Sequence, residues 1–325
     1  MPNKFNYTLI RIKNYNRQNL MNLLITGGLG HIGTFFLENV HKIKKVKKIY
    51  VIDKLEEKMI NIINLTHKRK INFINQDLSK KKINLKNKVK FSAVIHLASL
   101  TNPSESFINK KFTIKHNLKC FTNILGYCKK NKIPLIHVSS TSIYGSKSLY
   151  IDENCKDLVP QSPYAEAKIN EEKILKKTKS NFKYVSLRFG TIVGPSSGMR
   201  FHTAANKFCM QAFLGKPFAV WKTALNQYRP YLSIRDSFYT FKFLLNNKIF
   251  DREIYNIVSE NLTVQDIIDK IKKHKSSQLS LVESKIMNSL SYKVQTLKIK
   301  NIGLNLKSSI SKDIENNFKL LNKKF

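Results

Sequence analysis

The stretch MNLLITGGLGHIG, Met21–Gly33, constrains the fold of this chain more than any other. Asn22–Thr26 is an apolar run with the length of a buried strand, and apolar residues recur at helical spacing after the glycines. Gly27 allows a tight turn with unusual backbone angles, Gly30 lets the main chain approach a pyrophosphate, and Gly33 lets the helix pack closely on the strand. The pattern predicts a strand, a turn and a helix whose free N–H groups face an anion.

A second apolar run, Ile49–Ile52, ends at Asp53, about 20 residues beyond the last of these glycines. At this distance an acidic residue takes the ribose 2′-hydroxyl of NAD. A tight turn without a ligand is the alternative, but strand, glycines, helix, strand and acid follow in the order expected of a dinucleotide site. Lys54 leaves NADP open as the coenzyme, because a cation beside this acid favours a 2′-phosphate.

The length and composition are those of a globular protein. The chain has 325 residues, of which 42% are hydrophobic, so it can form one large α/β unit or a main domain with a smaller one. No apolar run reaches about 18 residues, and we therefore expect no membrane-spanning helix and no membrane partner. The cysteines form neither a CxxC pair nor a zinc spacing, which predicts buried free thiols in a reducing compartment, a cytoplasmic protein and no metal site. They are Cys120, Cys128, Cys155 and Cys209.

The formal net charge is +37, and only eight of the 58 cationic residues are arginines. Such a charge attracts nucleic acid or an anionic surface. The lysines are nevertheless spread along the chain among many Asn and Ile residues, as an AT-rich genome tends to encode. We favour this compositional origin over a dedicated polyanion site, so nucleic acid is the less favoured partner.

Residues 1–20 are basic, contain no acidic residue and have no long apolar core, which excludes an ordinary secretory signal. Because the first predicted strand begins at Met21, we expect a disordered basic extension that arises from an upstream start codon. An organellar transit peptide is the alternative, but the segment is rich in asparagine and has no serine.

The next predicted strands are Ile71–Ile74, Ala93–Leu97 and Leu135–Val138, and a helical pattern over Phe112–Lys130 separates the last two. Strands that alternate with helices predict an α/β fold with a parallel, doubly wound sheet of the Rossmann type. His96 lies inside its strand, which favours a packed core histidine over a catalyst.

Polar residues also stand at informative positions outside the strands. Asp77 comes just past the third predicted strand, where an acid is placed to bond an adenine amino group; a helix cap is the alternative. On the helical segment Phe112–Lys130, Asn117 is a polar residue that we expect to point inward. Near the C-terminus, Thr263 and Asp266 form a capping box ahead of an apolar-periodic helix.

Hydroxyl side chains crowd the end of the fifth strand, in Ser139–Gly145 (SSTSIYG). Further on, Tyr164 and Lys168 stand four residues apart and therefore share one face of a helix that begins within Ser162–Lys168 (SPYAEAK). An ammonium beside a phenol stabilises the phenolate, so we expect Lys168 to lower the pKa of Tyr164 from about 10 and let it remove a hydroxyl proton. Ser140 is placed to share a hydrogen bond with the same substrate hydroxyl.

Taken together, these motifs make the sequence similar to the extended short-chain dehydrogenase/reductases, specifically the NAD-dependent epimerase/dehydratase family that acts on nucleotide sugars. The resemblance runs from Met21 to the C-terminus. It is carried by TGGLGHIG (Thr26–Gly33), Asp53, Asp77-Leu78, HLAS (His96–Ser99), SSTSIYG (Ser139–Gly145), SPYAEAK (Ser162–Lys168), LRFGTIVGP (Leu187–Pro195) and RPYLSIRD (Arg229–Asp236). It implies a Rossmann domain over residues 21–187, joined by part of 226–260, and a smaller C-terminal domain over 188–325 that mainly binds a nucleotide sugar.

The resemblance also assigns roles to residues that match the family's motifs. Tyr164 is then the acid/base, Lys168 its partner and Ser140 the hydroxyl that orients the substrate. The implied cofactor is NAD. The residues implied to bind it are Gly27, Gly30, His31, Ile32, Gly33, Asp53, Asp77, Leu78, Leu97, Ala98, Ser99, Asn117, Tyr164 and Lys168.

On the substrate side, the resemblance implies that Arg229 contacts the nucleotide diphosphate, since a planar cation suits bidentate phosphate binding. Thr191 stands where the family usually has an asparagine that contacts the diphosphate. Arg200 is a further substrate-side candidate. The late arginine and acid of the family's nucleotide site have no clear counterpart over 279–302.

The residues after Ser140 are Thr141 and Ser142, where the family's 4,6-dehydratases place an acidic residue. Dehydration is therefore disfavoured, and the resemblance implies a 4-epimerase: Tyr164 takes the C4 hydroxyl proton, NAD takes and returns a hydride, and the transient 4-keto sugar rotates in between. A 4-keto reductase or dehydrogenase, a 4,6-dehydratase and, from another class, a non-catalytic RNA-binding relative stay open. The implied partners are a nucleotide sugar, expected to be UDP-linked, and a second copy of the chain, docked through the helix of Tyr164 and the helix near Phe112.

Overall fold

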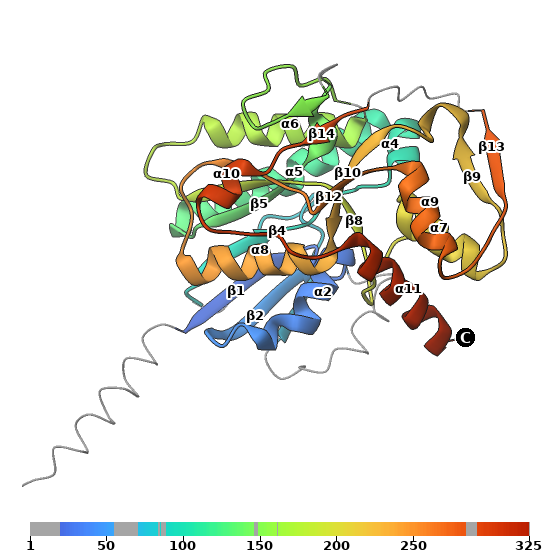
Figure 1. Cartoon of the computed structure of the whole chain (residues 1–325). Coiled ribbons are helices and arrows are strands. Elements are labelled where there is room, and N and C mark those ends of the chain that lie inside the picture. The colour runs from blue at the N-terminus through green and yellow to red at the C-terminus, as the bar shows by residue number, and fades with distance from the viewer. Residues whose placement is uncertain are drawn as a thin grey trace, which may run out of the picture.

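A parallel sheet of seven strands forms the centre of the molecule (Figure 1). The computed structural model describes residues 20–54, 71–83, 85, 89–145, 149–160, 162–283 and 291–324. In their order across the sheet, the strands are β11 (Ile254–Ile257), β7 (Tyr184–Phe189), β5 (Leu135–Ser140), β4 (Ala93–His96), β1 (Met21–Thr26), β2 (Val46–Asp53) and β3 (Ile71–Asn75). The order reverses between β1 and β4, and ligands of doubly wound sheets bind at the carboxyl edge beside such a switch point.

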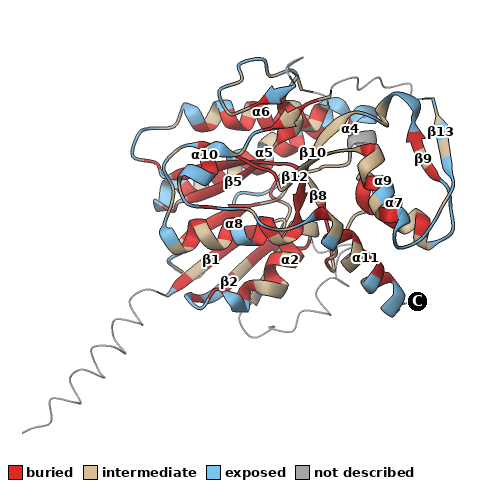
Figure 2. Ribbon diagram, viewed as in Figure 1, coloured by how far each residue is buried: buried red, intermediate tan, exposed pale blue. Residues whose placement is uncertain are grey.

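Helices cover both faces of this sheet, α2 (His31–Asn39) and α8 (Ile234–Asn247) on one side and α5 (Lys110–Asn131) and α6 (Pro163–Lys176) on the other (Figure 1). Because side chains alternate along a strand, β1 supplies Leu23 and Ile25 to the core under α2 and α8, and Leu24 to the core under α5. Burial on both faces explains why these strands read as continuous apolar runs. Figure 2 shows the buried residues concentrated on the strands and on the inner sides of the helices.

A second, smaller group of elements lies beyond the carboxyl end of the sheet and has its own apolar core, which includes Phe208, Phe218 and Ile268. Its largest sheet contains β8 (Thr191–Val193), β10 (Tyr228–Ser233) and β12 (Glu260–Thr263). Two further pairs join β9 (Phe218–Trp221) to β13 (Leu279–Val282) and β6 (Tyr150–Ile151) to β14 (Lys293–Val294). The remaining helices are α4 (Pro103–Ile108), α7 (Ala204–Phe213), α9 (Val264–Lys272), α10 (Leu297–Asn301) and α11 (Ile310–Lys324), and short 3₁₀ turns lie at Val40–Lys42, Thr141–Ile143 and Lys222–Ala224.

Most sequence-based expectations for individual elements are confirmed. The predicted strands and the helix over 112–130 are present with ends within one or two residues, except that β2 begins three residues before its predicted start. His96 is fully buried. The cysteines are free thiols, but Cys155 is only half-buried, because it lies in a loop outside the main cores. The helix after Thr263 begins with the predicted capping box, in which each partner's side chain accepts the other's backbone N–H. In the described part of the chain, no helix has the length and apolar character needed to cross a bilayer. The expectation for residues 1–20 falls, except for Leu20, outside the described residues.

Candidate active site

Three glycines at the junction of β1 and α2 are packed so tightly that a Cβ at any of them would collide with its neighbours. Gly27 has φ +68°, and a Cβ there would lie 2.6 Å from the backbone of Ala98. A Cβ on Gly33 would lie 2.5 Å from Gly28, and one on Gly28 would lie 2.6 Å from Cγ1 of Val51. The need for glycine at position 28 was missed by the sequence analysis, because it comes from a β2 side chain.

Gly30 differs from these glycines, because a Cβ there would meet only ordinary contacts, 3.4 Å from the Gly27 carbonyl and 3.6 Å from the Arg200 guanidinium. It caps α2 with extended backbone angles and offers no side chain to the helix end. No side chain of Gly30 bonds the first N–H groups of α2, and their binding of an anion stays a prediction. Arg200, predicted on the substrate side, lies against this turn, and its Nη1 donates to Thr101 Oγ1 at 2.5 Å.

Asp53 ends β2 beside the same turn and is almost fully buried. Its Oδ2 accepts the N–H of Leu29 at 2.9 Å, and its Oδ1 accepts the N–H of Lys54 at 2.8 Å. The carboxylate thus fixes the glycine turn, and its predicted bond to a ribose hydroxyl stays a prediction. The Lys54 ammonium lies 3.4 Å from the Asp77 carboxylate, with which it forms an ion pair.

Asp77 follows β3 and caps a turn rather than a helix, since its Oδ1 accepts from both the N–H and the hydroxyl of Ser79. Burial opposes ionisation, but Ser79 and Lys54 together lower the pKa of Asp77. Asp77 also forms a group with His116 and Cys120, whose potential ligand atoms lie within 4.8 Å of one another. Burial raises the pKa of the Cys120 thiol to about 12, so this thiol is a proton-bearing core group. The absence of a metal site stays a prediction.

The loop after β4 completes this edge of the sheet. The side-chain amide of Asn117 accepts the N–H of Leu100 at 2.8 Å and donates to its carbonyl at 3.0 Å. This pair of hydrogen bonds fixes the loop that carries Leu97, Ala98 and Ser99 next to Gly27. Ser99 Oγ is buried without a hydrogen-bond partner among the described residues. An orphaned hydroxyl beside a glycine turn and an acid fits the predicted dinucleotide.

Three other predicted coenzyme residues serve the protein's own packing. His31 Nε2 lies 2.7 Å from the Gly194 carbonyl, and burial lowers the pKa of this histidine to about 4, so the neutral ring donates its proton there. Ile32 packs against the core under α2, and Leu78 belongs to the core under α5. His31 therefore ties the glycine turn to the loop that follows β8. The coenzyme roles of all these residues stay predictions.

Tyr164 and Lys168 lie on one face of α6, as expected. The helix begins where predicted: Ser162 Oγ accepts the N–H of Ala165, and Pro163 occupies the first turn. The Lys168 ammonium lies 5.7 Å from the centre of the Tyr164 ring. Ser140, at the end of β5, bonds to the phenol of Tyr164 and shares a 2.8 Å hydrogen bond with Ser142 Oγ. The topology thus brings the three predicted catalytic residues together.

The acidity of Tyr164 differs from the expectation. Burial raises the pKa of this phenol, and the negative charge of Glu171 adds to the effect. Lys168, Ser140 and Arg200 oppose the rise but do not cancel it. The prediction that Lys168 brings the pKa of Tyr164 below its ordinary value is therefore wrong, because burial of the phenol outweighs the effect of the ammonium and the charge of Glu171 adds to the rise.

That carboxylate belongs to Glu171, which the sequence analysis did not single out. Its Oε2 accepts from Lys168 Nζ at 2.8 Å and from His137 Nε2 at 2.7 Å. A residue three positions after Lys168 is recognisable as a helix neighbour, but such pairs usually lie on exposed faces. The histidine partner comes from β5 and could not be found from spacing.

The predicted substrate residues lie on the smaller group of elements. Thr191 begins β8 and pairs with Tyr231 of β10, and Arg229 lies on the same β10 strand. Arg229 donates to Gln227 Oε1 at 2.6 Å and to the Tyr228 carbonyl at 3.1 Å. Burial lowers the pKa of this guanidinium. The segment 279–302, searched for a late arginine and acid, lies partly outside the described residues.

Comparison with known proteins agrees with this geometry. The sequence model of the "NAD dependent epimerase/dehydratase family" matches residues 23–258. The chain is 26% identical over 228 residues to an ADP-L-glycero-D-manno-heptose-6-epimerase of Brachyspira hyodysenteriae, covering 66% of this chain and 69% of that protein. It is 29% identical over 275 residues to a dTDP-D-glucose 4,6-dehydratase of Dictyostelium discoideum, covering 78% of this chain and 62% of that protein.

The fold is shared with solved structures. The UDP-glucuronic acid 4-epimerase of Bacillus cereus, crystallised with UDP-glucuronic acid and NAD, superimposes with a TM-score of 0.82. The match covers 94% of this chain and all of that one, at 24% identity. Since the family's sequence pattern spans most of the chain, including the glycine turn, Asp53, Tyr164 and Lys168, the chain belongs to the NAD-dependent epimerase/dehydratase family, whose coenzyme is NAD.

Proposed function

We propose that the protein is a nucleotide-sugar 4-epimerase in which Tyr164 is the acid/base. The observation that carries the proposal is the meeting of Ser140, Tyr164 and Lys168 at the carboxyl edge of the sheet, beside the glycine turn. A phenol held between a hydroxyl and an ammonium can accept and return the proton of one sugar hydroxyl.

The surroundings of Ser140 favour epimerisation over dehydration. Elimination of water needs a further acid/base near the sugar ring, but the next two residues are Thr141 and Ser142. Thr141 donates to the Phe189 carbonyl, and Ser142 bonds to Ser140. The carboxylate that acts on Tyr164 is Glu171, which is buried and bound to Lys168. Oxidation and reduction at a single carbon are the chemistry these groups support.

NAD, when bound, supplies the hydride acceptor and donor of the reaction. The glycine turn and Asp53 are proposed to hold it, and Tyr164 and Ser140 to orient the sugar hydroxyl and exchange its proton. Arg200 and Arg229 provide planar cations for a diphosphate. A UDP-linked sugar is the proposed substrate, because solved relatives of this fold are complexed with UDP-sugars.

The first experiment measures whether the coenzyme stays with the protein. We expect about one NAD per chain after a high-salt wash and denaturation, because a redox-neutral epimerase need not exchange its coenzyme. The same sample is then offered a panel of UDP-sugars, and epimers are separated by chromatography. If the protein retains no NAD and turns over only with added coenzyme, the result would support a reductase or dehydrogenase instead. If nucleic acid survives the wash, the result would support an RNA-binding relative.

Replacement of Tyr164 by Phe tests the acid/base role. We expect turnover to fall by about a hundredfold or more while NAD stays bound, because only the phenolic hydroxyl is removed. Tyr144→Phe is the matched control: its hydroxyl is buried against Asn256 and Arg188, and its removal should leave turnover of the folded protein nearly unchanged. Full activity of the Tyr164 variant would exclude the proposed mechanism.

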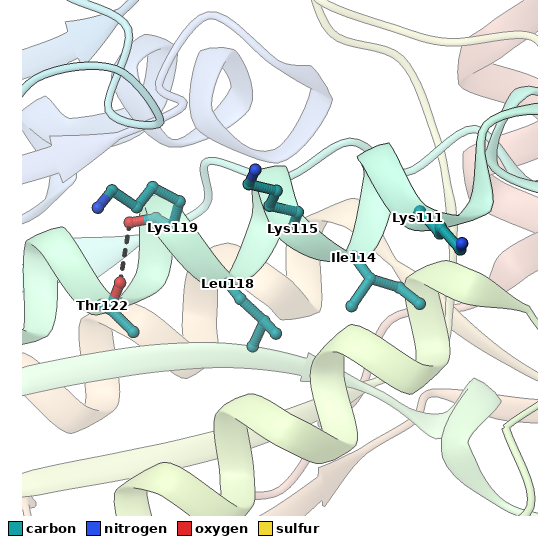
Figure 3. A pocket seen from close by; sticks show the side chains of 6 residues that line it. All are labelled: Lys111, Ile114, Lys115, Leu118, Lys119 and Thr122. Atoms are coloured by element: carbon teal, nitrogen blue, oxygen red, sulfur yellow. Dashed lines mark hydrogen bonds between the residues drawn. The ribbon is translucent and has the colours of Figure 1, made fainter.

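We also propose that the protein is a homodimer that docks through α5 and α6. The outer side of α5 carries a shallow hollow of about 500 Å³. Figure 3 shows Ile114 and Leu118 extending from one side of the helix and Lys115 and Lys119 from the other; all four line the hollow. Earlier in α5, Phe112 is 60% exposed, and at the end of α4, Ile108 is 79% exposed. An apolar strip of this kind is typical of a surface that a second copy covers.

A further inference from the structure

A buried ion pair with a histidine attached lies beneath Tyr164. The Lys168 ammonium and the Glu171 carboxylate are 2.8 Å apart, and His137 Nε2 is 2.7 Å from the same carboxylate oxygen. All three side chains are at most 3% exposed. A buried charge needs a partner in good geometry, so the position of the lysine head is set by this carboxylate.

The protonation states follow from the contacts. Burial opposes ionisation of Glu171, but Lys168 and His137 outweigh it and lower the pKa of this carboxyl to about 2. Burial lowers the pKa of His137, so its ring is neutral. An ionised carboxylate only accepts, so His137 Nε2 carries the ring proton and donates it to Glu171, while Nδ1 accepts from Ser186 Oγ at 2.9 Å. The carboxylate is thus an anion held by one cation and one neutral donor.

We propose that Glu171, fixed by His137, is a positioning residue that holds the Lys168 ammonium and offsets its charge beneath Tyr164. The proposal rests on the acid/base role of Tyr164 given above. A neutralised ammonium stabilises a phenolate less than a free one does. Tyr164 therefore stays a phenol over a wider pH range than the lysine alone would allow, and it can donate as well as accept a proton.

Other titratable groups face this cluster from the neighbouring elements. His96 of β4 is fully buried, and burial lowers its pKa to about 3, so it is neutral. Cys120 of α5 is a neutral thiol, and Glu172 of α6 is bound by Arg188. Arg200 places a constant positive charge near Tyr164. None of these groups changes charge near neutral pH, so none of them adds a titration there. Within the cluster itself, burial lowers the pKa of the Lys168 ammonium and Glu171 raises it, so Glu171 acts on Tyr164 directly and through this lysine.

The substitution is Glu171→Gln, which keeps the side chain's size and removes its charge. The titration of Tyr164 is followed by phenolate absorbance in the full-length, NAD-loaded protein, with a Tyr164→Phe variant of each background subtracted. We expect the midpoint in E171Q to fall by about one pH unit, because the charge that opposes the phenolate is gone. No sugar is needed, so this result stands or falls separately from the proposed epimerase activity.

Glu172→Gln is the matched control. Glu172 is the next residue on α6, equally buried, and accepts from Ser139 Oγ at 2.6 Å and Arg188 Nη2 at 2.7 Å. Its loss should destabilise the fold without moving the Tyr164 midpoint, whereas Glu171→Asp should restore much of the wild-type midpoint. If E171Q and E172Q titrate alike, or if E171Q titrates like the wild type, Glu171 does not act on Tyr164.

A measurement on the unchanged protein covers the case in which E171Q fails to fold. The ¹⁵N shifts of the His137 ring distinguish its tautomers. We expect a neutral ring with the proton on Nε2 around neutral pH. A proton on Nδ1 would mean that the Glu171 carboxyl donates to Nε2 and is uncharged, and the proposal would then be wrong.

Discussion

Gly28 illustrates a constraint that acts on a single residue through a neighbour distant in sequence. A methyl group at this position would lie 2.6 Å from Val51 Cγ1 and 3.5 Å from Ile25 Cγ2. We expect Gly28→Ala to lower the free energy of unfolding by about 1–3 kcal/mol, as overpacked cores do. Val51→Ala removes the colliding methyl, so the double variant should be more stable than the sum of the single effects predicts. Urea unfolding measures the coupling, and strict additivity would show that Val51 does not impose the constraint.

Gly30 provides the opposite case at the same turn. A methyl group there would meet ordinary contacts, and the backbone angles, φ −77° and ψ 179°, suit alanine. Gly30→Ala should therefore change the free energy of unfolding by less than about 0.5 kcal/mol. It should nevertheless reduce the NAD retained after purification, because the methyl occupies the space between the turn and Arg200. Unchanged NAD content would show that the coenzyme does not approach Gly30.

At the residue scale, the sequence predicts groups whose spacing is local and misses those whose partners are remote. The glycines of the turn, Asp53 and the Tyr164–Lys168 pair follow from regular spacing along one strand or helix. Glu171 was overlooked because its meaning depends on His137, a strand residue 34 positions earlier. Burial of the phenol likewise depends on the whole fold, which is why the direction of the Tyr164 pKa shift was mispredicted.

At the element scale, the cap of α9 is a strong local signal with a measurable energy. Thr263 Oγ1 accepts the Asp266 N–H at 3.0 Å, and the Asp266 carboxylate accepts the Thr263 N–H at 2.8 Å. The helix packs Ile267, Ile268 and Ile271 into the core of the smaller group. We expect Thr263→Ala to cost about 1 kcal/mol of unfolding free energy and Thr263→Ser to cost little, since serine caps equally well. Equal losses in urea unfolding would mean that the methyl group, and not the cap, stabilises this helix.

The elements that the sequence predicted carry such local signals, whereas several others, among them β7 and α8, were not assigned from the sequence. Ser162 and Pro163 mark the start of α6, and apolar runs mark β1, β2, β4 and β5. The pairs β9–β13 and β6–β14 join strands of two to four residues across long separations, as in Tyr150 opposite Lys293. Segments this short carry no periodicity, so their pairing becomes visible only when the chain is folded.

At the scale of the whole molecule, the net charge of +37 opposes every association with a second copy. Of its cationic residues, Lys111, Lys115 and Lys119 line the hollow on α5, beside Ile114 and Leu118. A homodimer across this surface brings two rows of lysines together while it buries the apolar side chains. Apolar burial and charge repulsion therefore act against each other in the proposed interface.

Salt separates these two contributions. The screening length falls from about 10 Å near 0.1 M salt to about 3 Å near 1 M, so repulsion between the lysines fades while apolar burial persists. We expect the dimeric fraction, measured by light scattering, to rise with sodium chloride and to be abolished by Leu118→Lys. Leu214→Lys is the control, because Leu214 is an exposed leucine at the end of α7, and its substitution should leave the dimer intact. A dimer that weakens with salt, or one unaffected by Leu118→Lys, would place the interface elsewhere on the molecule.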